Sequence, residues 1–309
     1  MTIMLRKESF VTAQCFIEAN ARPLDVALWR FYFSEASTES VLSVLRRYQN
    51  PDGGFGHALE PDLRATESSA LCTSIAFQIF RTIAAKPDDS MVAQAVSYLL
   101  RTLDRARRHW RIIPTSADAS PHAPWWNQAG REDTFNSFSL NPTAEILGYL
   151  YDFPEHVSAE IVSLVSDRVM VHLSDLDTIE MHELLCCLRL LQTRNLPQTV
   201  REQVRHKLTE LIKETVACDP TQWKGYSLRP LQVVQSPDSP FMDGLEEAVD
   251  ANLDYEIASQ SKDGSWTPTW TWGDAYPDDW KKARLEWSGV ITLEKLLKLT
   301  AFNRIEKTA

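Results

Sequence analysis

Aromatic and acidic side chains gather in the segments that we expect to form loops. The side chains that could act on a ligand are Phe55, Glu60, Asp62, Trp125, Trp126, Asp238, Trp270, Trp272 and Asp274. Aromatic faces attract cations and pack against apolar chains, and carboxyl groups can donate or accept protons. This combination suits a carbocation, an isoprenoid tail or a sugar ring as the ligand. For Phe55 the alternative is that its ring simply wedges between neighbouring helices.

Two aspartates, Asp175 and Asp177, directly precede the apolar run of an expected helix over residues 179–192. A proton donor must be a carboxylic acid that stays protonated. Burial beside a second carboxylate raises the pKa of one of the two groups and so meets this need. The alternative is structural, because aspartate and threonine commonly cap helix N-termini and Thr178 follows Asp177. Both interpretations are open at this point.

Metal-binding patterns are weak in this sequence. His182 and Cys186 lie one helical turn apart and could share a metal, but such residues on an apolar helix usually belong to the core. No Asp-Asp-x-x-Asp run is present to bind magnesium diphosphate, and no glycine-rich loop is present to hold a phosphate. We therefore expect no metal and no cofactor.

Composition limits the class of protein. A chain of 309 residues without a low-complexity linker is expected to form a single domain over residues 1–309. The net charge of −10 argues against a nucleic-acid partner, because binding to the phosphate backbone requires a cationic surface. No apolar stretch approaches the length of a signal peptide or a membrane span, and the five cysteines form no Cys-x-x-Cys pair. We expect a cytoplasmic protein, with peripheral membrane contact and the oligomeric state left open.

The periodicity of the chain is helical almost throughout. Apolar residues recur at three- and four-residue steps, and no segment alternates like a strand. The expected helices cover residues 8–19, 23–34, 39–48, 68–83, 89–103, 141–151, 156–172, 179–192, 198–217, 241–259 and 286–300. Two long segments, 112–138 and 223–241, interrupt this pattern, and loops of that length are often functional. The alternation of helices with loops of unequal length favours an all-α closed ring of hairpins over a four-helix bundle.

One short pattern occurs twice, at Gln49–Phe55 and at Gln260–Trp266. Each copy reads Gln-x-x-Asp-Gly-(Gly/Ser)-(Phe/Trp), ends one expected helix and precedes another. We therefore predict that the two loops are structurally equivalent. This pattern resembles the glutamine–tryptophan repeats of the terpene cyclase and protein prenyltransferase superfamily. The resemblance implies an α/α toroid of about six helical hairpins. Between the two copies the chain matches that family only in its helical rhythm.

The same resemblance gives the two aspartates a role. Ser174–Thr178 looks like the Asp-x-Asp-(Asp/Thr) motif of proton-initiated terpene cyclases, which implies that Asp177 is the protonating acid and Asp175 its partner. The sequence departs from the family at Thr178, where a third aspartate is usual. Protein prenyltransferases hold zinc with an Asp-x-Cys pair, and Cys218-Asp219 has the wrong order and spacing for it.

Three functions are consistent with these features. The first is an isoprenoid-handling, terpene cyclase-like enzyme, which protonates an apolar polyprenyl-type small molecule in a central cavity without a metal. The second is a carbohydrate-active α/α barrel, a hydrolase or lyase with two loop carboxylates as acid and base. The third is a non-catalytic toroid that binds a lipid or a peptide. The load of aromatic side chains in the loops makes the first our working hypothesis.

Overall fold

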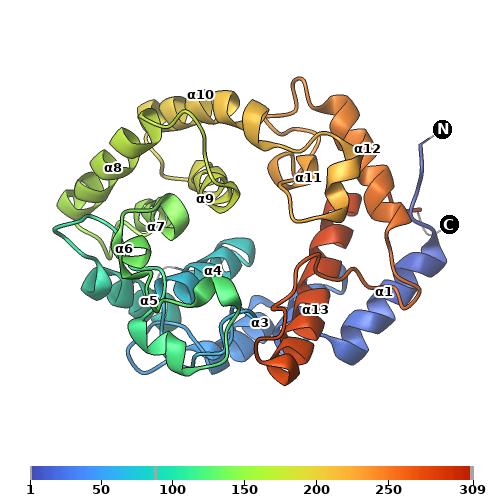
Figure 1. The fold of residues 1–309 in the computed structure, drawn as a ribbon, viewed down its shortest axis with the longest axis horizontal. Coiled ribbons are helices and arrows are strands. Elements are labelled where there is room, and N and C mark those ends of the chain that lie inside the picture. Colours follow the sequence, from blue (N-terminus) through green and yellow to red (C-terminus); the bar gives the residue numbers. More distant parts are fainter. Residues whose placement is uncertain (1, 87–88, 307–309) are drawn as a thin grey trace. The chain divides into compact units, whose positions relative to one another are not determined.

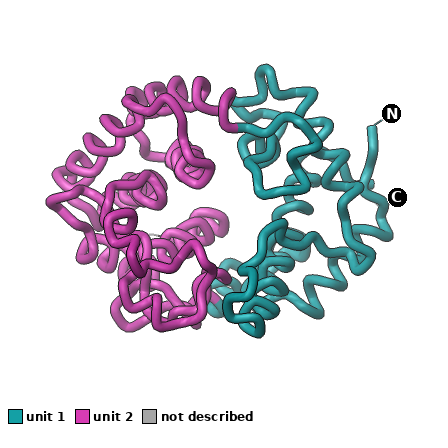
Figure 2. The backbone as a smooth tube through the Cα atoms, viewed as in Figure 1, with its two compact units in different colours: residues 1–44, 216–309 teal, residues 45–215 magenta. Residues whose placement is uncertain are grey.

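The computed structural model describes residues 2–86 and 89–306, which divide into two compact units (Figures 1 and 2). The first unit comprises residues 1–44 and 216–309, and the second comprises residues 45–215. The described residues form helices, loops and isolated backbone bridges, with no strand. The predicted all-α class is therefore confirmed. None of the helices in the described ranges is long and apolar enough to cross a membrane.

The helices of each unit follow the chain. The first unit contains α1 (Lys7–Asn20), α2 (Pro23–Phe33), α3 (Thr38–Leu45, ending at the unit boundary), the 3-10 helix η4 (Pro220–Lys224), α11 (Pro230–Val233), α12 (Glu246–Ala258) and α13 (Pro277–Ala301). The second contains η1 (Arg46–Tyr48), α4 (Ala70–Thr82), α5 (Ser90–Thr102), η2 (Thr115–Ala119), η3 (Pro124–Trp126), α6 (Glu132–Asn136), α7 (Leu140–Asp152), α8 (Ala159–Ser174), α9 (Met181–Leu191) and α10 (Gln198–Thr215).

Most expected helices lie within three residues of the observed ones, but two starts were wrong. Helix α12 begins at Glu246, five residues later than expected. Helix α13 begins at Pro277, nine residues before the expected start at 286, so Trp280 lies on a helix and not in a loop. Proline is favoured at the first helical position, and Asp278 and Asp279 complement the positive end of the helix dipole. The proline and the two aspartates therefore mark the start of α13. Apolar periodicity does not mark it, because the first turns of α13 are mainly polar.

Helix α7 forms the centre of the second unit, where it packs against α4, α8 and α9. Its residues from 142 to 150 are all buried, so other elements surround the helix on every side. The ring of Tyr149 stacks on that of Phe77 from α4, with the centroids 4.9 Å apart. The Arg81 guanidinium, also from α4, lies over the Tyr149 ring at 4.7 Å. Aromatic stacking and a cation–π contact thus join α4 to α7.

The two ends of the described chain meet in the first unit, where α1 packs against α13. The Leu5 N–H donates to the Arg304 carbonyl at 2.8 Å, and the Glu306 N–H donates to the Leu5 carbonyl at 3.0 Å. Arg304 is 3% exposed, and its guanidinium pairs with Asp250 and Asp254 of α12. A buried arginine therefore links α12 to the segment that follows α13.

The two Asp-Gly loops have the same conformation. Gly53 and Gly264 both have φ of +87°, in the left-handed region that glycine enters without a Cβ penalty. In each loop the carboxylate of the preceding aspartate, Asp52 or Asp263, accepts the N–H of the residue after the glycine at 3.0 Å. This closes each turn in the same way.

The glutamine of each copy joins its turn to a helix that is distant in sequence. Gln49 donates to the carbonyl of its loop glycine and to that of Met91, in the first turn of α5, both at 3.0 Å. Gln260 donates to its loop glycine at 2.9 Å and to the Ser9 carbonyl, in the first turn of α1, at 3.1 Å. The predicted structural equivalence of the two loops is confirmed.

Candidate functional site

The aromatic side chains of the two Asp-Gly loops belong to the core. Phe55 is fully buried, its ring contacts that of Phe80 edge to face at 6.0 Å, and its N–H donates to the Thr73 hydroxyl at 3.1 Å. Trp266 makes the equivalent backbone bond, to the Thr292 hydroxyl at 3.0 Å. Each aromatic residue therefore fixes its turn to the helix that follows, which is the wedge expected for Phe55 as the alternative to ligand contact.

The loop that leaves the first Asp-Gly turn, residues 56–65, is buried although it has no regular structure. Every residue from 58 to 63 is buried, including Glu60 at 7% and Asp62 at 3% exposure. His57 and Ala58 have φ of 55° and 59°, a conformation that costs energy for residues other than glycine. Strained backbone of this kind concentrates at functional sites. The loop therefore places two carboxylates inside the second unit on an unfavourable backbone that the surrounding structure must hold.

A second loop, residues 111–138, covers the loop that carries the two acids. The Ala123 N–H donates to the Asp62 carbonyl at 2.9 Å, and the Arg64 N–H donates to the Pro121 carbonyl at 3.0 Å. These bonds pair the two loops as short antiparallel segments. The segment that bears Trp125 and Trp126 thus runs beside the backbone of the loop that bears Glu60 and Asp62.

Trp125 and Trp126 lie in η3, directly after this backbone pairing. Trp125 is 38% exposed, whereas Trp126 is half-buried. The indole N–H of Trp126 is buried without a hydrogen-bond acceptor among the described residues. A buried donor without a partner is costly and unusual in folded proteins. The junction therefore combines two buried carboxylates with aromatic surface and an unused donor.

Polar side chains hold the covering loop in place. Arg111 donates to the side-chain oxygens of Gln128 and Asn136, and the amide of Gln128 donates to Asp118 at 3.2 Å. Gln128 is 4% exposed. The conformation of the segment that carries the tryptophans is therefore fixed in part by bonds among its own side chains.

A second buried polar group connects α4, α7 and α9 and was not anticipated from the sequence. Glu145 of α7 is 2% exposed, forms an ion pair with Arg189 at 3.1 Å and accepts from Gln78 at 3.2 Å. Burial, together with the nearby Glu145 charge, raises the pKa of Cys186 well above its ordinary value. The thiol stays protonated and is a poor nucleophile. A glutamate within the apolar run of α7 was the available signal for this network.

In the first unit, three aromatic rings form a connected row. Trp270 contacts Tyr226 at 5.6 Å and Trp287 at 5.2 Å, both edge to face. Tyr226 is 55% exposed and Trp270 is half-buried, so this row reaches the surface. Trp272 differs, because it is 1% exposed and packs against Trp280 at 5.6 Å. Of the two tryptophans expected to contact a ligand here, Trp270 lies near solvent and Trp272 belongs to the core.

Four of the acids that we expected to act on a ligand are exposed. They are Asp175, Asp177, Asp238 and Asp274. The residue that caps α9 is Glu180, whose carboxylate accepts the N–H of His182 at 2.7 Å and that of Glu183 at 3.3 Å. The structural alternative for Asp177 and Thr178, capping of this helix, is therefore wrong, because the helix begins only at Met181. The burial that a protonating acid requires is also missing at Asp177.

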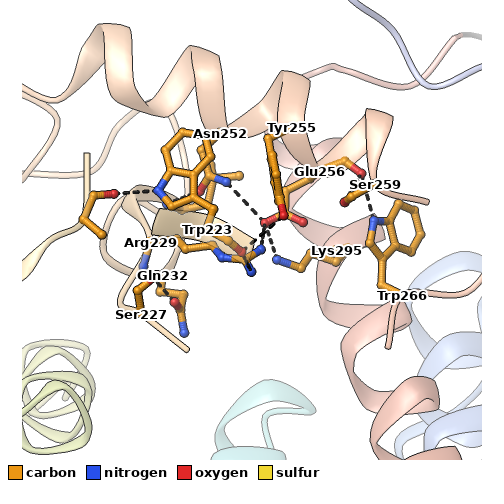
Figure 3. Close-up of polar contacts among 12 residues, drawn as sticks. Trp223, Ser227, Arg229, Gln232, Asn252, Tyr255, Glu256, Ser259, Trp266 and Lys295 are labelled. Atoms are coloured by element: carbon orange, nitrogen blue, oxygen red, sulfur yellow. Dashed lines mark hydrogen bonds and ion pairs between the residues drawn. The ribbon is translucent and has the colours of Figure 1, made fainter. Parts of the chain in front are cut away.

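A buried polar cluster of the first unit is centred on Glu256 of α12 (Figure 3). One oxygen of this carboxylate, Oε1, accepts from Lys295 of α13, from Arg229 at 3.1 Å and from Asn252 at 3.2 Å. The other oxygen is buried without a donor among the described residues. This cluster was not expected from the sequence, because α12 has only a weak apolar face, on which Asn252 and Glu256 are buried together with Leu253.

The charges of this cluster shift each other's protonation. Burial alone would raise the pKa of Glu256, but Lys295 and Arg229 together hold it below its ordinary value. Burial lowers the pKa of Lys295 to about 8, and the Glu256 carboxylate opposes this effect only in part. Near neutral pH the cluster therefore contains two cations and one carboxylate, although Lys295 is close to losing its proton.

Comparison of the chain with protein-family models and with curated proteins finds no match. In the described ranges, no group of three or more histidine, cysteine, aspartate or glutamate side chains is arranged to hold a metal ion. The site must therefore be interpreted from its own chemistry.

Proposed function

We propose that the protein is an isoprenoid-handling, terpene cyclase-like enzyme on an α/α-toroid fold, with its acid in the loop of residues 56–65. The observation that carries this proposal is the burial of Glu60 and Asp62, two residues apart, in a strained loop covered by the segment that bears Trp125 and Trp126. Asp177 was the expected acid, but its exposure makes the buried pair the better candidate.

Proton-initiated chemistry on an alkene requires a carboxylic acid that remains protonated. Burial and a nearby second carboxylate both favour the protonated form. The cation that follows proton transfer needs aromatic faces and an environment that excludes water. Glu60 and Asp62 are buried carboxyl groups of the kind that this step needs, and the tryptophans of the neighbouring segment supply aromatic faces.

The test is product formation from linear polyprenols and their diphosphates without added metal. We expect turnover by the wild type and a loss of about 100-fold or more in Glu60→Gln or Asp62→Asn, the usual range for removing a general acid. Asp177→Asn is the matched control, because it makes the same chemical change at an exposed carboxylate, and it should retain activity. Circular dichroism melts of all variants separate loss of activity from loss of folding. Absence of turnover by the wild type on every substrate, or loss confined to Asp177→Asn, would refute the proposal.

A carbohydrate-active function is the second candidate, favoured by one observation. Trp125 is 38% exposed, and sugar rings stack on accessible indole faces, whereas an apolar chain is better served by buried ones. Glu60 and Asp62 would then act as the acid and base of a hydrolase or lyase. Release of reducing ends from a panel of neutral and acidic oligosaccharides, lost in Glu60→Gln and in Asp62→Asn, would favour this function over the first.

A further inference from the structure

We propose that Arg229 and Lys295 of the first unit form a binding site for a small oxyanion, such as a sulfate, phosphate or carboxylate group. This proposal does not depend on the function proposed above, which rests on a loop of the second unit. Figure 3 shows the two cationic side chains converging on the carboxylate of Glu256.

The charges of this cluster do not balance. Arg229 and Lys295 have side-chain exposures of 11% and 14%, and within the described chain the only carboxylate paired with either of them is that of Glu256. The cluster therefore has an excess of one positive charge in a largely desolvated place. An uncompensated buried charge is costly, and a bound anion would remove that cost.

Both cations also have N–H donors that make no hydrogen bond among the described residues. A lysine ammonium has three N–H donors, and the hydrogen-bond acceptor of Lys295 among the described residues is Glu256 alone. Arg229 has five donors, of which one reaches Glu256 and another reaches the Trp223 carbonyl. Two cations that share one carboxylate and retain free donors can hold an oxyanion through several charge-assisted bonds.

The two cationic side chains are partly exposed, and the Arg229 guanidinium is held in a fixed position. The side chains of both cations retain some exposure to solvent, whereas the Glu256 side chain is 2% exposed. The Arg229 guanidinium also lies over the Tyr255 ring at 5.2 Å, and the Tyr255 hydroxyl donates to the Trp223 carbonyl at 3.2 Å. The guanidinium is therefore held in place before any ligand arrives, which reduces the entropy lost on binding.

Calorimetric titration of sulfate into the full chain at pH 7 and low ionic strength tests the site. Sulfate keeps its charge between pH 6 and 9, and saturable binding distinguishes a site from the general stabilising effect of this ion. We expect one saturable site in the wild type, weakened at least about tenfold in Lys295→Met, because a charged donor is lost. Lys282→Met, on the exposed face of the same helix, is the matched control and should bind like the wild type.

The pH dependence of the wild type gives a test that does not depend on a variant. Lys295 faces Glu256 from α12, Arg229 from the start of α11 and Lys298 from its own helix, and its pKa is about 8. Between pH 7 and pH 9 it should lose most of its charge, so sulfate affinity should fall roughly tenfold. No saturable binding by the wild type, equal affinity in Lys295→Met and Lys282→Met, or affinity unchanged from pH 7 to pH 9 would each overturn the proposal.

Discussion

Replacing Gly53 with alanine tests the docking of the first Asp-Gly turn onto α5. A Cβ atom on Gly53 would lie 2.4 Å from the Gln94 carbonyl oxygen and 2.8 Å from its carbon. These are backbone atoms, so the contact can be relieved only by moving the turn or the helix. Such movement would stretch the bond from Gln49 to the Met91 carbonyl in the same helix.

The magnitude follows from two contributions. Placing alanine at φ of +87° costs about 1–2 kcal/mol, and the reduced freedom of the unfolded chain offsets about 0.4–1 kcal/mol of this. Overpacking against the helix adds about 1–3 kcal/mol. We therefore expect Gly53→Ala to lower the free energy of unfolding by about 1–5 kcal/mol.

Gly130 provides the matched control, because it lies in the same unit with φ of +72° and has no atom within 4 Å of its Cβ position. Gly130→Ala should therefore show only the backbone contribution, about 0–1.6 kcal/mol. The assay is urea unfolding of both variants, with the midpoints compared at equal slope. Equal midpoints for Gly53→Ala and Gly130→Ala would refute the argument that close approach to α5 requires glycine at position 53.

Three further predictions concern caps, charges and the second turn. Glu180→Ala should destabilise the protein by about 1 kcal/mol through loss of the α9 cap, whereas Asp177→Ala should change the urea midpoint little; the reverse order would contradict the observed cap. Burial lowers the pKa of Lys295 to about 8 from an ordinary value of 10.5, so the unfolded chain binds more protons between these values. The contribution of Lys295 to the free energy of unfolding should then rise as pH increases from 8 to 10.5, seen as the difference between the wild type and Lys295→Met; a difference independent of pH would contradict this. Gly264→Ala, whose Cβ would lie 2.4 Å from the Thr12 carbonyl carbon, should destabilise the first unit more than Gly273→Ala, which has open space, in the same urea assay.

Local patterns in the sequence determined the helices and the two Asp-Gly turns. The periodicity of residues 89–103 and 68–83 predicted α5 and α4 to within two residues, because each turn of an amphipathic helix repeats the same apolar spacing. The shared order of glutamine, aspartate and glycine predicted two equivalent turns, since a positive φ and an aspartate that bonds two residues ahead are properties of neighbouring residues. The start of α13 at Pro277 was missed because its signals are capping signals without periodicity.

Tertiary structure alone decided which acids are buried. Asp62 and Asp177 are both loop aspartates, yet Asp62 is 3% exposed in a loop whose backbone pairs with residues 121–123, and Asp177 is exposed to solvent. The group around Glu256 likewise joins side chains that are 27 and 39 positions away in the chain. Burial and charge pairing depend on contacts between distant segments. The spacing of residues along one helix or loop does not predict those contacts.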